Sequence, residues 1–155
     1  MEAGKMVKRI QEMRDEGYLS DAILREMVKQ LKVADPDFNF VGVYKFNAAD
    51  NELWLHNYLG EPTDHAKIPA GTGVCGTAIV ERQNQNVSDV TQVENYLACS
   101  PKVKSELVVL IRAGDDIFAQ IDIDSREKNG FPPATQEAVE LVADKLAEVF
   151  VAEQR

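Results

Sequence analysis

The order of the hydrophobic patterns constrains the fold of this chain more than any other feature of its sequence. Apolar residues recur three or four positions apart in residues 1–35 and again in residues 134–153, and this spacing predicts amphipathic helices. Between these segments the sequence changes to runs that alternate apolar and polar residues, which is typical of strands. Helices at both ends of a strand-rich middle predict an α+β fold in a single domain.

The limits of these elements can also be predicted. Ser20 or Asp21 is a suitable cap for the second helix, and Pro36 should end it because proline disfavours helical geometry in the residue before it. Strands are expected at 38–46, 52–59, 106–112 and 116–123, with an edge segment at 66–69. Residues 84–89 should close the short helix before them and lead into an irregular stretch. The first of these strands should turn one face to the core. The terminal helices would then pack on one face of a central antiparallel sheet, and the sheet and any pocket would span 38–125.

The charge balance excludes some partners. The 155 residues include 26 acidic and 17 basic ones, which gives a net charge of −9. A chain this acidic, whose basic residues are scattered, would repel the phosphates of nucleic acid. No apolar run reaches the roughly 18 residues that span a bilayer, and residues 1–14 lack the apolar block of a signal peptide. These features predict a cytoplasmic protein with no nucleic-acid or membrane partner.

Two cysteines, Cys75 and Cys99, are too few for a disulfide scaffold in a cytoplasmic chain. Neither His56 nor His65 pairs with them at a spacing that zinc sites use, so no metal site is expected.

Cys75 follows a run of glycines that matches the dinucleotide-binding fingerprint by letter only. Gly71, Gly73 and Gly76 have the right spacing, but Asp89 comes too early to be the acidic partner, and the strands that follow are expected to be antiparallel. The glycines are better explained as a sharp turn into a short helix that begins near Cys75. The positive end of the helix dipole would favour the thiolate of this cysteine; alternatively, it is a small buried side chain that fills space.

Asp122 and Asp124 flank Ile123, so their side chains point to the same face of the last strand, and Glu106 opens the neighbouring strand. This acidic face could simply meet solvent. Alternatively, the three carboxylates lie beneath the irregular stretch that bears Cys99 and form an acidic pocket. In such a pocket one carboxyl group stays protonated because of its neighbours and can donate a proton.

Together these segments resemble a known family, the free methionine-R-sulfoxide reductases, which are stand-alone GAF domains. The resemblance covers about residues 38–131, and the order and spacing of its landmarks are more specific than any one of them. The landmarks are NFVGVY at 39–44, IPAGTGVCGT at 68–77, LAC at 97–99, SELVV at 105–109 and DIDS at 122–125.

The resemblance implies a role for several residues. Cys99 matches the catalytic cysteine of the family, and Cys75 matches a second cysteine found in many members. The substrate pocket would be lined by Glu106, Asp122, Asp124, Tyr44 and Phe40, the last standing where the family has a tryptophan. The usual resolving cysteine is replaced by His65, and Tyr96, Leu97 and Ser100 also depart from the pattern around Cys99.

The implied activity is thiol-dependent reduction of free L-methionine (R)-S-oxide to methionine. The thiolate of Cys99 would attack the sulfur while one of the carboxylic acids protonates the departing oxygen, which leaves Cys99 as a sulfenic acid. Cys75 or an external thiol would resolve it, and thioredoxin or a small thiol would restore the enzyme. The resemblance implies no metal or organic cofactor.

Two other classes of function remain open. A diverged GAF domain could bind a small amine-bearing molecule without turning it over, as a sensor. The chain could also be a dimerising domain that uses its first and last helices, and a homodimer is compatible with each of these functions.

Overall fold

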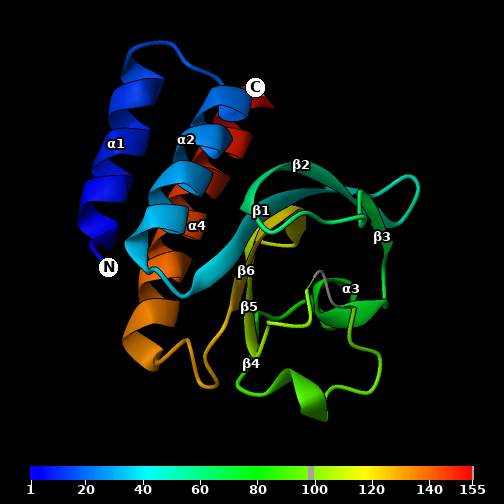
Figure 1. Ribbon diagram of the computed structural model, residues 1–155. Coiled ribbons are helices and arrows are strands. Elements are labelled where there is room, and N and C mark those ends of the chain that lie inside the picture. The colour runs from blue at the N-terminus through cyan, green and yellow to red at the C-terminus, as the bar shows by residue number, and fades with distance from the viewer. Residues whose placement is uncertain (98–99, 155) are drawn as a thin grey trace.

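The computed structural model describes residues 1–97 and 100–154 and has four α-helices (Figure 1). The helices are α1 (Ala3–Asp15), α2 (Ser20–Ala34), α3 (Gly73–Glu81) and α4 (Pro133–Glu153), with a short 3-10 helix, η1 (Val90–Gln92). The strands are β1 (Phe38–Asn47), β2 (Glu52–Gly60), β3 (Lys67–Pro69), β4 (Gln85–Val87), β5 (Ser105–Ala113) and β6 (Asp116–Ser125). The predicted α+β class is confirmed.

The six strands form one sheet in the order β3-β2-β1-β6-β5-β4, and every neighbouring pair is antiparallel. The β1–β2 and β5–β6 hairpins follow from the short turns between their strands, as the sequence predicts. The two hairpins meet where β1 pairs with β6. This pairing places β1 beside the sequence-distant β5–β6 hairpin in the middle of the sheet.

Helices α1, α2 and α4 form a layer over one face of the sheet (Figure 1). Their apolar stripes, with Ile10, Met27 and Val142 completely buried, pack against the side chains that β1, β5 and β6 present to that face. The burial of these stripes, rather than helix propensity, holds such helices in place. The expectation that the terminal helices share one face is confirmed.

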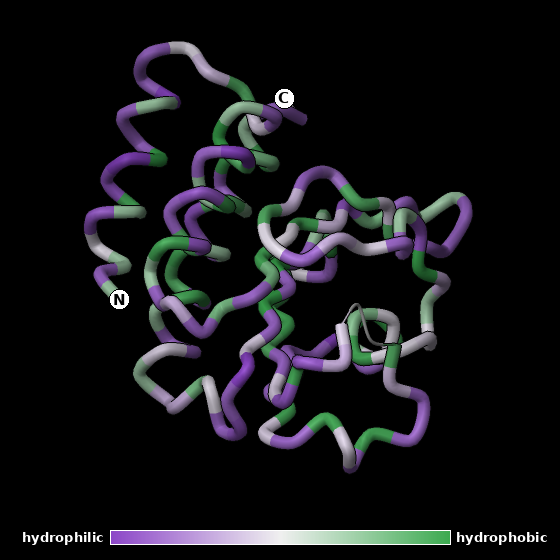
Figure 2. The backbone as a smooth tube through the Cα atoms, in the orientation of Figure 1, coloured by the Kyte–Doolittle hydropathy of each residue, from purple (hydrophilic) through white to green (hydrophobic). Residues whose placement is uncertain are grey.

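The opposite face of the sheet carries α3 and the connections around it, and a second, smaller apolar cluster lies between them. Tyr44, Val108 and Leu110 contribute to this cluster from the sheet, and Val74 and Ala78 contribute from α3. Figure 2 shows the apolar residues concentrated along the central strands and recurring turn by turn in the helices that cover them. The sheet therefore separates two cores of different size.

Alternation along the central strands divides their side chains between these two cores. On β5, Leu107 and Val109 belong to the core under the helical layer, whereas Val108 belongs to the smaller cluster. On β6, Ile121 and Ile123 lie under the helical layer. The residues that alternate with these isoleucines, Asp122 and Asp124, must therefore point to the opposite face, toward α3.

The structure differs from the sequence predictions in three places. Strand β1 is buried on both faces from Phe38 to Tyr44, not on one, because the smaller cluster covers its second face. Leu19 occupies the cap position of α2, and no side chain caps that helix there. Instead, the backbone N–H and the hydroxyl of Ser20 both donate hydrogen bonds to the carboxylate of Glu153 at the end of α4. Strand β4 lies within 84–89, where a helix end and no strand was expected.

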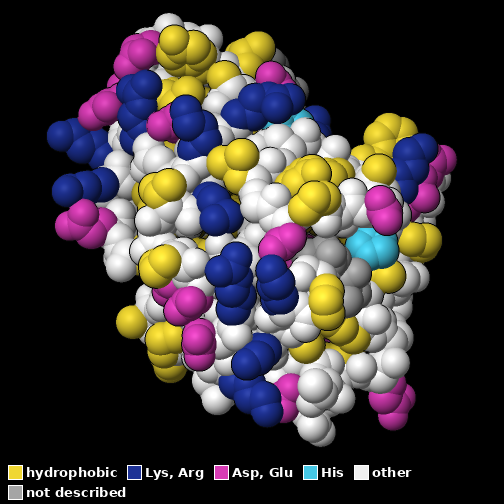
Figure 3. Space-filling model, viewed as in Figure 1, with side chains coloured by type: hydrophobic (Ala, Val, Ile, Leu, Met, Phe, Trp, Pro, Cys, Tyr) yellow, Lys and Arg dark blue, Asp and Glu magenta, His cyan; other side chains and the backbone are white. Residues whose placement is uncertain are grey.

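Positive and negative side chains lie interspersed on the face of the molecule seen in Figure 3. None of the helices in the described parts of the chain is long and apolar enough to cross a membrane.

Candidate functional site

A small cavity lies between the sheet and α3. Its volume of about 20 Å³ is enough for one or two water molecules. The described residues around it come from β1, β3, β5, β6, the connection between β2 and β3, the start of α3 and the segment before residue 98. They are Phe40, Tyr44, Thr63, His65, Ile68, Thr72, Gly73, Val74, Cys75, Leu97, Glu106, Asp122 and Asp124.

The three carboxylates predicted to share a face do converge on this cavity. Glu106 pairs with Asp124 across β5 and β6, and Asp122 is two residues further along the same face. All three are buried, with exposed fractions of 4% for Glu106, 5% for Asp122 and 3% for Asp124. The alternative that this acidic face meets solvent is therefore wrong.

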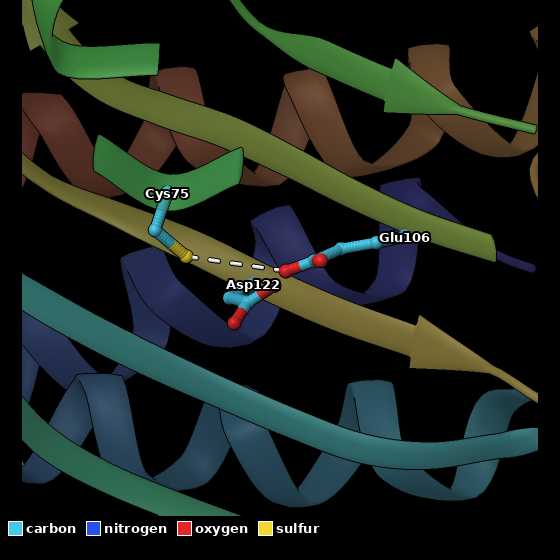
Figure 4. A group of neighbouring side chains, drawn as sticks. All are labelled: Cys75, Glu106 and Asp122. Carbon is cyan, nitrogen blue, oxygen red and sulfur yellow. Dashed lines mark hydrogen bonds between the residues drawn. The ribbon is translucent and has the colours of Figure 1, made fainter. Parts of the chain in front are cut away.

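The structure brings Cys75 to the same point. Glycine-rich backbone with positive φ at Gly71 and Gly73 turns the chain sharply into α3, as expected, and places Cys75 in the first turn of that helix. Its thiol donates a long hydrogen bond to Glu106, with 4.0 Å between Sγ and Oε2 (Figure 4). Figure 4 also shows Asp122 on β6 pointing into the space between these two groups.

The electrostatics of this group oppose a free thiolate. Burial raises the pKa of Cys75 well above its ordinary value, and the negative charges of Asp122 and Glu106 raise it further. Of the two alternatives for Cys75, a thiolate favoured by the dipole of α3 and a small buried side chain, its burial and its raised pKa support the second. Cys75 is a neutral thiol at neutral pH.

The same surroundings affect Asp122. Burial raises its pKa, although hydrogen bonding to Glu106 and Cys75 and the charge of His65 oppose the increase. One oxygen of Asp122, Oδ1, is buried and has no hydrogen-bond partner among the residues that the structure describes. An ionised carboxylate in this position is costly unless a cation or a hydrogen-bond donor joins it.

Two aromatic residues form a wall of the cavity, as predicted. Phe40 stacks on Tyr58 of β2, with ring centroids 5.3 Å apart. The hydroxyl of Tyr44 donates a 3.0 Å hydrogen bond to the backbone oxygen of His65. Gly42 lies between them on β1, and a Cβ there would come within 2.9 Å of the Phe40 ring, so only glycine leaves this ring in place.

Sequence reasoning missed a supporting residue and most of the apolar wall. Gln120, completely buried on β6, donates a 3.1 Å hydrogen bond to the backbone oxygen of Cys75 and so fixes the start of α3 to the sheet. It lies two residues before Asp122, so the alternation that located the carboxylates could have indicated it. Thr63, Ile68 and Leu97 carried no comparable signal, because their place on the wall depends on how the connections fold.

Cys99, the predicted catalytic cysteine, lies outside the described residues. His65, which stands where the family has its usual resolving cysteine, lies on the cavity wall.

Comparison with known proteins identifies relatives of this chain. Residues 19–150 match the GAF domain family. Protein YtsP of Bacillus subtilis is 33% identical over 111 residues, which cover 72% of this chain and 68% of that protein. The free methionine-R-sulfoxide reductase of Escherichia coli is 30% identical over 114 residues, covering 74% of this chain and 67% of that protein.

A solved structure matches over almost the whole chain. It is the free methionine-R-sulfoxide reductase of Neisseria meningitidis in complex with its substrate, which is 26% identical and superimposes with a TM-score of 0.88. The match covers 98% of this chain and 90% of that one.

Proposed function

This chain belongs to the GAF domain family and, within it, is related to the free methionine-R-sulfoxide reductases, and on this premise we propose that it reduces free L-methionine (R)-S-oxide to methionine. The observation that carries the proposal is the buried, acidic cavity with aromatic walls between the sheet and α3. It combines groups for each part of this substrate: carboxylates for an ammonium group and for proton transfer, and aromatic rings for an apolar side chain.

Recognition of the free amino acid would depend on the carboxylates. No lysine or arginine is among the described residues that line the cavity, so a positively charged group from outside is favoured there. The ammonium of a free amino acid supplies that charge and can donate to the unpartnered Oδ1 of Asp122. A residue within a peptide has no such group, which supports the free amino acid as the substrate.

The proposed chemistry uses Cys99 as the nucleophile. Its thiol adds to the sulfoxide sulfur while a carboxylic acid of the cavity protonates the oxygen. The hydroxyl then moves to the cysteine sulfur, so methionine is released and Cys99 becomes a sulfenic acid. The raised pKa of Asp122 supports it as the proton donor, because the upward shift increases the share of molecules in which this carboxyl group holds a proton that it can give away.

Cys75 would then close the cycle. Its thiol attacks the sulfenic acid, a disulfide forms and water leaves; thioredoxin or a small thiol reduces the disulfide. Cys75 starts as a neutral thiol, and the Glu106 carboxylate 4.0 Å away can accept its proton as the attack begins. Reduction of the disulfide by thioredoxin or a small thiol suits a reducing compartment such as the cytoplasm. Self-association through the helical layer is compatible with this cycle.

The experiment is to incubate the purified protein with each epimer of free methionine sulfoxide and with N-acetylmethionine sulfoxide, with dithiothreitol as reductant. We expect methionine from the free R epimer and little or no product from the other two. Comparable rates on the free and the acetylated compound would contradict recognition of the ammonium group. Preference for the S epimer would contradict the assignment of substrate.

One observation favours a second function, a GAF sensor domain that binds an amine-bearing molecule without turnover. Cys75, which lines the cavity, is held as a neutral and therefore weakly reactive thiol. The same assay separates the two functions. Saturable binding of free methionine sulfoxide with no methionine formed would establish the sensor.

A further inference from the structure

Three potential metal ligands from different elements meet on the cavity floor. They are the thiol of Cys75 on α3 and the carboxylates of Glu106 on β5 and Asp122 on β6 (Figure 4). One sulfur or oxygen atom from each of them lies within 4.8 Å of the other two. All three side chains are buried, and within the described part of the chain Oδ1 of Asp122 has no hydrogen-bond partner. The spacing of cysteines and histidines along the sequence gave no sign of this group.

This arrangement gathers acidic groups, and His65 is the described residue of the cavity lining whose positive charge acts on Asp122. Two carboxylates and a thiol share a buried space, and the described lining of the cavity contains neither lysine nor arginine. Buried carboxylates need a proton, a cationic ligand or a metal ion to offset the loss of water. A substrate ammonium would do this for Asp122, but it would not use the thiol.

We propose that Cys75, Glu106 and Asp122 bind a single zinc-like divalent cation. The proposal rests on the geometry of the cavity and not on turnover. Thiolate sulfur together with carboxylate oxygen is a ligand set that Zn²⁺ accepts. In a tetrahedral zinc site a sulfur and an oxygen ligand are roughly 3.6 Å apart, given the usual bond lengths. The present separations, up to 4.8 Å, need to shorten by only about 1 Å, which side-chain rotation supplies.

The fourth coordination position is left for water. The cavity has room for one or two water molecules beside the three side chains. A structural zinc site has four protein ligands, whereas three protein ligands and a water leave one coordination position open to another ligand.

Binding is coupled to a proton. The cation replaces the proton of the Cys75 thiol, so one metal–sulfur bond forms, one sulfur–hydrogen bond breaks, and H⁺ is released without any change of oxidation state.

The bound cation would inhibit the proposed reductase. It occupies the proposed resolving thiol and two of the proposed acids at the same time. The substrate ammonium and the cation would compete for Asp122, so each weakens binding of the other.

The test is an ultraviolet titration with Cd²⁺, which behaves like Zn²⁺ here and gives a charge-transfer band when a thiolate binds it. The protein is kept reduced with a phosphine, because dithiothreitol binds the metal. We expect one equivalent of Cd²⁺ to saturate the band, loss of the band in Cys75→Ser, and at least tenfold weaker binding in Asp122→Asn. Asp116→Asn, which removes an exposed carboxylate from the same strand, should bind as the unaltered protein does.

The second cysteine provides the decisive control. Cys99→Ser should keep the band, since the thiol of Cys75 remains. A band that survives Cys75→Ser but disappears in Cys99→Ser would overturn the proposal, and so would the absence of saturable binding in the unaltered protein. Thermal unfolding of each variant shows that it is folded before it is titrated.

The result of the Cd²⁺ titration can be distinguished from the result of the methionine assay that tests the proposed function. If Cd²⁺ binds as described but the metal-free protein forms no methionine, the metal site stands and the reductase does not. If the metal-free protein is active and no Cd²⁺ band forms, the reverse holds.

Discussion

The Sγ atom of Cys75 lies 4.0 Å from Oε2 of Glu106, although 31 residues separate them and one is on a helix while the other is on a strand. This proximity has two chemical consequences. A carboxylate so close discourages ionisation of the thiol at rest, and it is also positioned to accept the thiol proton once an electrophile arrives. The following predictions test the roles of these and neighbouring residues.

The two cysteines should have separable roles. Cys99→Ser should abolish methionine formation, because serine cannot be oxidised to a sulfenic acid. Cys75→Ser should keep a single turnover but recycle slowly with thioredoxin, and dithiothreitol should partly restore its rate by attacking the sulfenic acid directly. Single-turnover and steady-state rates measured for both variants check this, and full activity of Cys99→Ser would rule out the proposed chemistry.

Mass spectrometry after one equivalent of substrate gives an independent measurement. A loss of two hydrogens in the intact protein would mark a disulfide between Cys75 and Cys99. Gain of a single oxygen, with no disulfide, would instead show that Cys75 has a structural role.

Removal of the buried charge of Asp122 should stabilise the protein while it weakens binding of the substrate. Because the folded state raises the pKa of Asp122, the contribution of this group to stability is fully present below its unfolded pKa of about 3.9 and is lost as the pH rises through the folded pKa. Asp122→Asn cannot ionise, so it should melt at a higher temperature than the unaltered protein at pH 7, by roughly 2–4 °C for each kcal/mol gained.

The advantage of Asp122→Asn should shrink as the pH falls, and thermal melts between pH 4 and pH 8 would measure it. The exposed Asp116→Asn serves as the matched control and should show little change. A lower melting temperature for Asp122→Asn at pH 7 would mean that a favourable interaction of the carboxylate outweighs its burial.

Close packing at the start of α3 should make Gly76 sensitive to substitution. A Cβ at this position would lie 2.7 Å from the backbone oxygen of Pro69 and 2.8 Å from the backbone nitrogen of Gly71, and backbone atoms cannot easily move aside. We expect Gly76→Ala to lower the free energy of unfolding by about 1–3 kcal/mol and to impair the cavity. Gly4→Ala in α1 meets no atom within 4 Å and should stabilise the protein by about 0.5–1 kcal/mol. Chemical denaturation of both variants tests the contrast.

Self-association, if it uses the helical layer, should depend on the exposed Leu141 of α4. Leu141→Asp should then shift a dimer toward the monomer in sedimentation at micromolar concentration. Val80→Asp changes an exposed apolar residue of α3, on the other side of the sheet, and should leave the distribution unchanged. A monomer for the unaltered protein at these concentrations would argue against association of this kind.

The sequence was informative where a pattern is periodic. Strand alternation placed Asp122 and Asp124 on one face, and helical spacing located the terminal helices, because both patterns reflect which side chains must be buried. The sequence was less informative about Cys75, where the helix dipole and the nearby carboxylates have opposite effects on the pKa of the thiol. Whether Cys75 favours its thiolate depended on how close Glu106 and Asp122 come to it, and no local pattern records that distance.

The missed features have similar physical reasons. Strand β4 is only three residues long and is held by its pairing with β5, so its own sequence carries a weak signal. The start of α2 uses Glu153 from the far end of the chain in place of a local cap, which no reading of residues near Ser20 could reveal.

The division of β6 between two cores bears on how such a domain can change over evolutionary time. Ile121 and Ile123 lie under the helical layer, while Asp122 and Asp124 line the cavity. Mutations at every second position can therefore change the ligand chemistry and leave the larger core almost untouched. A library that varies only positions 106, 122 and 124 should yield many folded proteins with new ligand preferences, whereas one that varies 107, 121 and 123 should yield mostly unstable ones. Adaptation of this domain to a new molecule is then a matter of a few alternating residues, not of a new scaffold.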